Sequence, residues 1–192
     1  HYIQPKINQN HLEELRHDRF KIVEEIYTKK SKIIEIYIKL KESIDNTLKE
    51  YEELLENYSI SINATFRLDN FENNFFNLIS QNKMGSFYGK DDGKQKLKEI
   101  LEDKNLNQFD ELKLILQDII FHLEKDCRKV EDEKMIISEQ LKNYDEFYKY
   151  LFSLDYIVPN YELMLDGKTL NELSPGEKGA LLLVFYLMLD KE

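Results

Sequence analysis

Apolar residues recur at steps of three and four from about residue 11 to residue 57, a stretch without glycine or proline. This period is that of one face of an α-helix. A first set of apolar positions gives way, after a slip in phase, to a second: Leu12, Leu15, Ile22, Ile26 and Ile33, then Ile33, Tyr37, Leu40, Ile44, Tyr51 and Leu55. Arg19 and Lys29 occupy two positions of the first set. A helix of this length spans about 65 Å, more than the width of a small domain. We therefore expect a coiled-coil arm over residues 1–58; the alternative is an amphipathic helix packed on its own domain.

The period then changes to two. Apolar residues alternate strictly over residues 60–68, which predicts a strand with one apolar face. Residues 71–82 return to helical spacing, with Phe71, Phe75, Phe76 and Ile79 expected to face the core. Residues 83–95 hold half of all the glycines, so we expect a solvent loop there.

Residues 94–154 contain no glycine or proline, which predicts a helical block. We expect breaks in it near Asn105 and Asn143. One helical stripe is predicted from Leu112, Ile115, Leu116, Ile119, Ile120 and Leu123. The charged run at residues 124–134, EKDCRKVEDEK, is interpreted as a solvated helical face with opposite charges four residues apart.

Beyond Pro159 the pattern predicts a β-hairpin. Residues 161–165 alternate, Asp166–Gly167 is a strong two-residue turn, and residues 168–170 can return. The hairpin leads into Leu173–Ser174–Pro175–Gly176–Glu177–Lys178 and an apolar run over residues 180–189. We expect a buried helix here whose first turn offers a serine hydroxyl and free backbone N–H groups. Such a helix end favours anions. The whole pattern predicts an α+β, predominantly helical fold with few strands.

The segment LSPGEKGALLLVFYLMLD, with the hairpin before it, resembles the signature loop and following helix of ABC-type ATPases, commonly LSGGQ or LSGGE. It is most similar to the SMC and RecN branch and to the TrlF-type ATPases. The resemblance implies that Ser174 and Gly176 contact the γ-phosphate of ATP held by the opposite head, that Glu177 fixes the loop, and that Lys178 completes the nucleotide-binding set. Pro175 departs from the usual glycine and removes one N–H donor.

The same resemblance implies the domain order: a coiled-coil arm over residues 1–58, and a partial C-terminal head lobe over residues 59–192 with a helical insertion at about residues 94–154. It implies a second ATPase head as partner, in a homodimer, with ATP and Mg²⁺ bound mainly by residues outside this chain. The clamped object is implied to be DNA, in DNA repair, maintenance or defence against foreign DNA.

The phosphate-binding Walker A sequence is missing. Gly89, Gly93 and Lys94 fail the P-loop spacing, because three residues separate the glycines and Gln95 follows the lysine. Asp166 precedes the signature loop and Asp190 follows it too closely, so neither fits a Walker B strand. We expect a fragment of a larger protein that is an ATP hydrolase only as a whole, with no catalytic or metal-ligating residue in this part.

Composition and charge argue against several classes of protein and of site. The net charge of −10 argues against a nucleic-acid platform by itself, since such binding rests on Lys and Arg. A single cysteine, Cys127, excludes an internal disulfide. No segment suits a membrane span or signal peptide, so we expect a cytoplasmic protein. The alternative to the ATPase hypothesis is a non-catalytic helical coiled-coil scaffold or adaptor, in which the turn at Ser174 only caps a helix.

Overall fold

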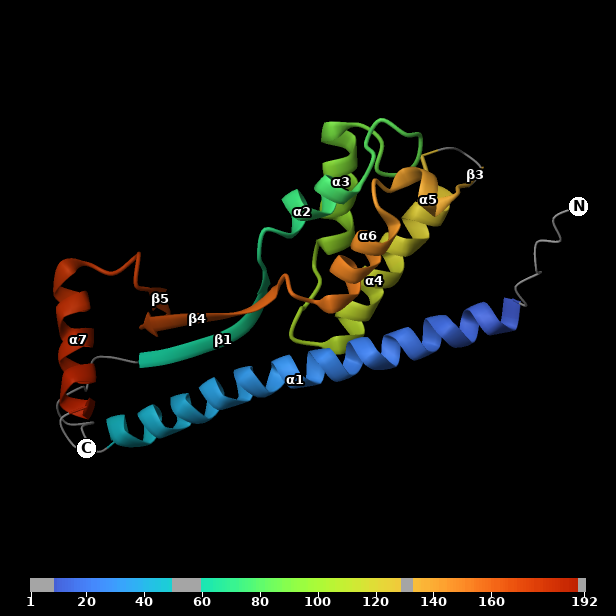
Figure 1. Ribbon diagram of the computed structural model, residues 1–192. Coiled ribbons are helices and arrows are strands. Elements are labelled where there is room, and N and C mark those ends of the chain that lie inside the picture. The colour runs from blue at the N-terminus through green and yellow to red at the C-terminus, as the bar shows by residue number, and fades with distance from the viewer. Residues whose placement is uncertain (1–8, 50–59, 129–132, 190–192) are drawn as a thin grey trace, which may run out of the picture. The chain divides into compact units, whose positions relative to one another are not determined.

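The computed structural model describes residues 9–49, 60–128 and 133–189 (Figure 1). They form α1 (Gln9–Lys49), β1 (Ile60–Leu68), α2 (Phe71–Leu78), α3 (Lys90–Leu101), α4 (Phe109–Glu124), β2 (Lys125–Asp126), β3 (Glu133–Lys134), α5 (Ile137–Gln140), α6 (Tyr144–Ser153), β4 (Ile157–Leu165), β5 (Lys168–Thr169) and α7 (Pro175–Leu189). The fold is α+β and mostly helical, with a long N-terminal helix and a three-stranded antiparallel sheet. At this level of detail the predicted fold class is confirmed.

The chain divides into two compact units. The helical unit comprises residues 1–29 and 68–157, and the sheet unit comprises residues 30–67 and 158–192. The helix α1 therefore contributes its first half to one unit and its second half to the other.

The predicted long helix is confirmed from Gln9 to Lys49, while residues 50–57 lie outside the described part of the chain. The side chains that α1 buries are Val23, Tyr27 and Ile34. They belong to a different face from the predicted coiled-coil positions, of which Leu12, Leu15, Ile22 and Ile33 are exposed. These four apolar side chains are therefore not buried by packing within the described residues. The coiled-coil arm stays a prediction.

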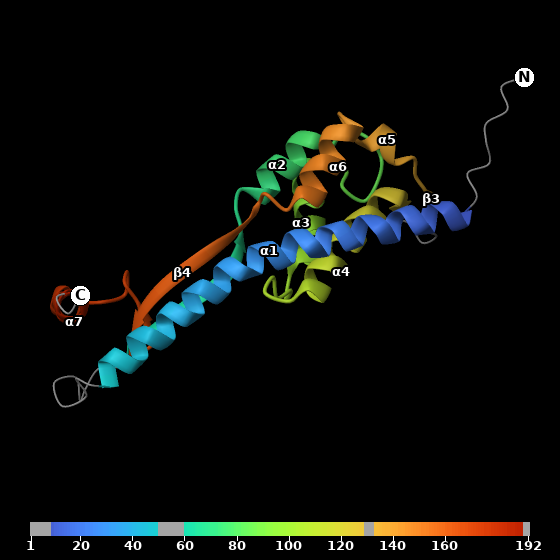
Figure 2. The ribbon, with the colours of Figure 1, turned by 60° about the horizontal axis from the view of Figure 1, so that its bottom comes forward.

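The core of the helical unit is built around Phe75, which is fully buried. Its ring contacts those of Phe76, Phe87 and Phe147 at centroid distances of 5.1, 5.2 and 5.9 Å. The predicted stripe of α4 faces this core, except that Ile120 is only half-buried. From α1, the Tyr27 hydroxyl donates to the Leu106 carbonyl at 3.1 Å. These contacts hold the first half of α1 together with α2, α4 and α6 in the helical unit (Figure 2).

The predicted loop at residues 83–95 is wrong in its second half, where α3 begins at Lys90. Gly89 adopts a φ of 79° just before the helix, and Asp91 and Asp92 in the first turn favour its N-terminus. Gly93 is buried within α3, where a Cβ would stand 2.6 Å from the Phe87 carbonyl oxygen. The glycines here serve a tight turn and close packing.

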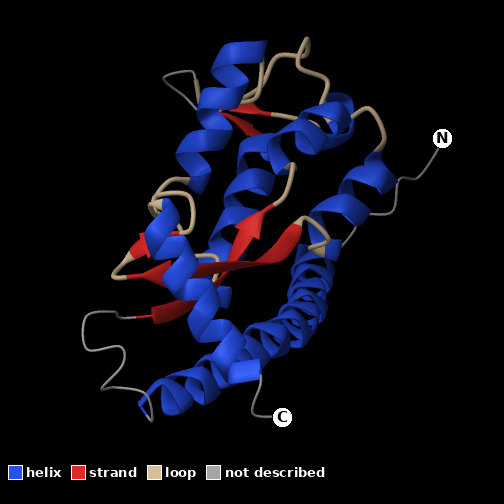
Figure 3. Ribbon diagram, turned by 90° about the vertical axis from the view of Figure 1, so that its left-hand side faces the viewer, coloured by secondary structure: helices blue, strands red, loops and turns tan. Residues whose placement is uncertain are grey.

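The predicted helical face at residues 124–134 is also wrong at residues 125–128 and 133–134, while residues 129–132 lie outside the described part of the chain. Lys125 and Asp126 of β2 pair with Lys134 and Glu133 of β3 in a short antiparallel hairpin (Figure 3). Asp126 is fully buried, and Arg128 donates two hydrogen bonds to its carboxylate at 2.8 Å each. An ion pair between the buried Asp126 and the exposed Arg128 therefore replaces the expected solvated charge pattern.

In the sheet unit, the strand order is β1-β4-β5. The predicted hairpin is confirmed: Leu165 pairs with Lys168 across the turn, and Asp166 and Gly167 both have positive φ, at 51° and 74°. Positive φ at both central residues is the requirement of a type I′ turn. This hairpin sets the direction in which the chain enters the segment before α7.

The predicted helix after the turn is confirmed as α7. Leu181 is buried, but Leu182, Leu183 and Tyr186 are exposed, so the expectation of a buried helix is wrong for these side chains. A helix that is apolar on all sides exposes apolar side chains wherever only one of its faces is packed. Among the described residues, no helix combines the length and hydropathy that crossing a bilayer requires.

Candidate functional site

The turn that precedes α7 is held in place by hydrogen bonds to Glu172. The carboxylate of Glu172 accepts from the backbone N–H and the hydroxyl of Thr169 at 2.8 and 2.9 Å, and these bonds lower the pKa of Glu172. The N–H of Glu172 in turn donates to the Thr169 carbonyl at 2.9 Å. Leu173 is buried next to this turn. The segment between β5 and α7 is therefore fixed before the chain reaches Ser174.

Ser174 and Glu177 form a capping box at the start of α7. The Ser174 N–H donates to Oε2 of Glu177 at 2.7 Å, and the Glu177 N–H donates to Oγ of Ser174 at 3.3 Å. Each side chain satisfies a backbone donor that the helix itself leaves unpaired. The Ser174 hydroxyl accepts a hydrogen bond in this arrangement, and its side-chain hydrogen bond with the Glu177 carboxylate is the largest cause of the lowered pKa of Glu177.

Glu177 also connects the helix start to the hairpin. Its Oε1 accepts a hydrogen bond from Nζ of Lys168 on β5 at 3.2 Å. Hydrogen bonding with Ser174, and secondarily with Lys168, lowers the pKa of Glu177 to about 2. The carboxylate is thus ionised near neutral pH, and Lys168 offsets its negative charge.

Gly176 provides the unoccupied donor of the first turn. Pro175 has no N–H, the N–H of Glu177 is taken by Ser174 Oγ, and the N–H of Lys178 donates to the Ser174 carbonyl at 3.0 Å. Within the described part of the chain, the N–H of Gly176 has no acceptor. No heavy atom lies within 4 Å of where a Cβ of Gly176 would stand. A ligand atom could therefore approach this backbone closely.

The four residues of the predicted nucleotide-binding set lie together in one helical turn. Ser174, Gly176 and Lys178 are exposed, and Glu177 is half-buried beneath them. Pro175 occupies the first helical position, where its missing N–H costs no intrahelical bond. A hydroxyl, a free N–H and the positive end of the helix dipole together suit an anion such as a phosphate oxygen.

The positions rejected as phosphate or metal sites lie elsewhere. Lys94 pairs with Glu72 at 2.5 Å on the helical unit, and Asp166 is exposed in the hairpin turn. Asp190 lies outside the described residues. Over residues 9–49, 60–128 and 133–189 no cluster of His, Cys, Asp and Glu could hold a metal ion.

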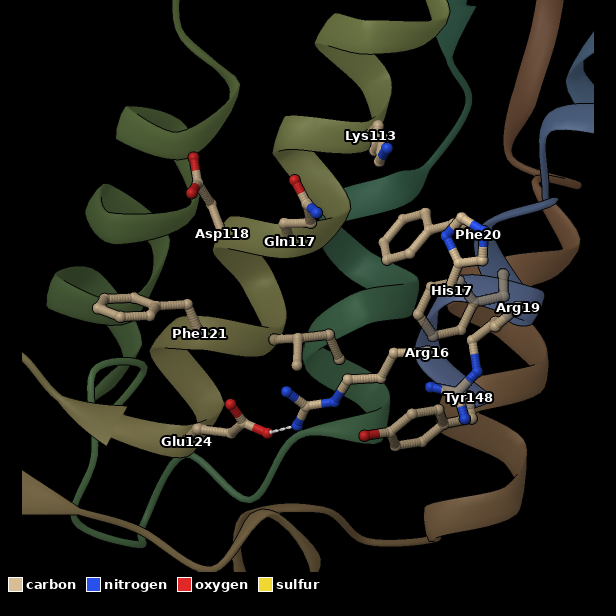
Figure 4. A pocket seen from close by; sticks show the side chains of 12 residues that line it. Arg16, His17, Arg19, Phe20, Lys113, Gln117, Asp118, Phe121, Glu124 and Tyr148 are labelled. Atoms are coloured by element: carbon tan, nitrogen blue, oxygen red, sulfur yellow. Dashed lines mark hydrogen bonds and ion pairs between the residues drawn. The ribbon is translucent and has the colours of Figure 1, made fainter. Parts of the chain in front are cut away.

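Sequence reasoning missed a groove on the helical unit between α1, α4 and α6, which we call the α1–α4–α6 groove (Figure 4). Its lining includes Arg19, Lys113 and Tyr148, which are far apart in the sequence. The available signal was Arg19, a cation in a position of α1 that the apolar pattern reserves for a hydrophobic residue.

No protein family, no curated protein and no solved structure matches the chain.

Proposed function

We propose that this chain is the signature-bearing part of an ABC-type ATPase of the SMC/RecN-like class, similar to the TrlF-type ATPases. In this proposal, Ser174 and Gly176 contact the γ-phosphate of ATP bound by the opposite head of a homodimer. Residues outside the chain hold the rest of the ATP and its Mg²⁺. The triphosphate supplies the negative charge that joins the two heads, and hydrolysis allows them to separate.

The observation that carries the proposal is the state of the first turn of α7. The unpaired N–H of Gly176 and the side chain of Ser174 lie on the same exposed helix end, with open space around Gly176. The sequence motif alone does not require the N–H of Gly176 to be free. A helix end that served only as a buried cap would have no need of this access.

Glu177 supports the proposal through its position. The residue holds the Ser174 backbone from one carboxylate oxygen and Lys168 from the other, so the turn is rigid before any ligand arrives. Pre-organised donors lose less entropy when they bind an anion than mobile donors do. Because Lys168 offsets the charge of Glu177, the carboxylate repels an approaching phosphate less than a free one would.

In the proposal the arm formed by α1 carries head closure to the clamped object. By the resemblance this object is DNA, in DNA repair, maintenance or defence against foreign DNA in the cytoplasm. The chain's net charge of −10 provides no separate support for DNA contact by this part of the protein.

The test is ATP turnover by the whole protein, with and without DNA, for the wild type, Ser174→Arg and Gly176→Val. We expect both variants to lose about 100-fold or more in turnover, the scale for losing a phosphate-facing donor, while ATP binding survives. Ser174→Arg removes the hydroxyl, and Gly176→Val keeps the N–H but places a side chain where the phosphate would approach it. Gly176→Val is informative because the open space at Gly176 accepts a side chain without a clash.

The matched control is Asn143→Ala. Asn143 caps α6 by accepting a hydrogen bond from the Glu146 N–H at 3.2 Å, so its loss removes a helix cap of the same kind away from the proposed site. Turnover should be unchanged in this variant. If Ser174→Arg and Gly176→Val also turn over ATP at the wild-type rate, the turn is only a helix cap and the ATPase proposal fails.

One observation favours the second candidate, a non-catalytic coiled-coil scaffold or adaptor. The exposed apolar residues of α1 and of α7 can serve assembly without any nucleotide. Under this alternative the whole protein binds no ATP at all. ATP binding by the whole protein therefore separates the two functions before any turnover is measured.

A further inference from the structure

The α1–α4–α6 groove combines cations with aromatic rings in a cavity of about 500 Å³. All of its lining residues belong to the helical unit. This volume falls within the range of pockets that bind small molecules. Side chains from α1 and α6 meet those of α4 across it, as Figure 4 shows for the ion pair between Arg16 and Glu124.

Two cations of the groove are held by aromatic faces and not by carboxylates. The guanidinium of Arg19 lies 4.7 Å from the ring centroid of Tyr148 and 4.8 Å from that of Phe152. Nζ of Lys113 lies 5.8 Å from the ring centroid of Phe20. Across the described residues no carboxylate forms an ion pair with either cation. Their positive charges are therefore available to an anion.

Cation–π contacts leave the hydrogen-bonding edges of Arg19 and Lys113 free while fixing where these groups lie. Burial raises the pKa of Tyr148 to about 12, so its phenol stays neutral and can donate a hydrogen bond. The exposed ring of Phe121 adds a flat apolar surface to the same groove. The ion-paired carboxylate of Glu124 adds an acceptor for an N–H donor.

We propose that the α1–α4–α6 groove binds a small phosphorylated ligand with one flat ring, of the mononucleotide class. Arg19 and Lys113 hold its phosphate, and the aromatic lining holds its ring. The flat ring distinguishes this class from a simple anion, because rings of nucleobases stack on aromatic side chains and on guanidinium planes.

A mononucleotide fits the observations better than a nucleic-acid strand does. The groove has a volume of about 500 Å³, which suits a small ligand, and a long polyanion would also meet the remainder of a chain with a net charge of −10. A single phosphate needs only the two local cations. Ser174 and Gly176 do not line the groove, so binding at the groove can be tested independently of the proposed ATPase function.

The test is a titration of the ¹⁵N-labelled chain with 5′-AMP, followed by amide chemical shifts. We expect saturable shifts concentrated in α1, α4 and α6, and weaker binding by about tenfold or more for Lys113→Glu and Arg19→Gln. Lys113→Gln serves as a milder second variant if the charge reversal disturbs folding. The controls are Lys149→Glu, the same charge change at an exposed position of α6 outside the groove, and Leu114→Ala on α4; both should bind as the wild type does.

Inorganic phosphate and adenosine, titrated separately, should each bind more weakly than 5′-AMP. Equal affinity for inorganic phosphate and 5′-AMP would overturn the assignment of a ring-bearing ligand. A single-stranded oligonucleotide whose affinity rises steadily with length would overturn it in favour of a strand-binding surface. Shifts that are unaffected by Lys113→Glu and Arg19→Gln, or no saturation at millimolar 5′-AMP, would exclude the groove as the site.

Discussion

Ser174 and Glu177 satisfy each other at the start of α7: the N–H of Ser174 donates to the Glu177 carboxylate at 2.7 Å, and the N–H of Glu177 donates to the Ser174 hydroxyl at 3.3 Å. Each residue provides the acceptor that the other one needs. Removing either side chain leaves a backbone donor unpaired, so the two substitutions are coupled and their effects should not add. The same pair sets the geometry on which the proposed phosphate contact depends.

The capping role of Ser174 makes a prediction about stability. Ser174→Ala should lower the free energy of unfolding by about 1 kcal/mol, whereas Ser174→Thr, which keeps a capping hydroxyl, should cost less. Urea denaturation monitored by circular dichroism measures both. Amide hydrogen exchange in the first turn of α7 locates the effect. Equal losses for alanine and threonine would show that the hydroxyl does not cap the helix.

Glu177 should titrate far below an ordinary glutamate. Its pKa in the folded chain is about 2, against an ordinary value of 4.5. Because the folded pKa is the lower one, the carboxylate contributes stability that is complete above about pH 4.5 and is lost as the pH falls toward 2. A ¹³C NMR titration of the Glu177 carboxyl group measures the midpoint directly.

Lys168→Met provides the control for that titration. Hydrogen bonding with Ser174 is the larger cause of the lowered pKa, so removing Lys168 should raise the midpoint only in part. Ser174→Ala should raise it further. A midpoint near 4.5 in the wild type would contradict the capping box.

Two helical glycines should respond in opposite directions to the same substitution. A Cβ on Gly93 would stand 2.6 Å from the Phe87 carbonyl oxygen, so Gly93→Ala should destabilise the chain by about 1–3 kcal/mol. Gly179 in α7 has open space, so Gly179→Ala should give the usual helix stabilisation of about 0.5–1 kcal/mol. Thermal unfolding of the two variants and of the wild type measures the sign of each change in stability. Stabilisation by Gly93→Ala would mean that α3 does not pack on the Phe87 backbone.

The features that sequence reasoning predicted correctly are those with a local signal. The stripe from Leu112 to Leu123 repeats over several turns, and Asp166–Gly167 has the residues that a type I′ turn requires. The hairpin of β2 and β3 has strands of two residues, too short to show any period. Its buried Asp126, which pairs with the exposed Arg128, resembles surface charge in the sequence. Composition alone therefore favoured a helix there.

The two candidate sites also differ in how far the sequence alone could predict them. The turn at Ser174 is contiguous, so its residues could be named from the sequence, although the free N–H of Gly176 required the structure. The α1–α4–α6 groove draws Arg19, Lys113 and Tyr148 from three separate helices, and no local pattern joins them. Only Arg19, a cation in an apolar position, pointed toward it.

The two faces of α1 can be separated with a pair of adjacent residues. Ile22 belongs to the predicted coiled-coil positions and is 58% exposed, whereas Val23 faces the helical unit and is 1% exposed. Ile22→Asp should leave the free energy of unfolding within about 0.5 kcal/mol of the wild type, while abolishing self-association. Val23→Asp should destabilise the chain by more than about 3 kcal/mol, because it buries an unpaired charge.

Sedimentation equilibrium of the chain and urea denaturation measure these two effects separately. If α1 forms a coiled coil with a second copy, association should depend on Ile22 and on its neighbours in the stripe, Leu15 and Ile26, which repeat at heptad spacing. A wild-type chain that stays monomeric at high concentration would leave the exposed stripe without a partner copy. In that case α1 is an amphipathic helix whose packing residues are Val23, Tyr27 and Ile34, and the proposed arm has no structural basis.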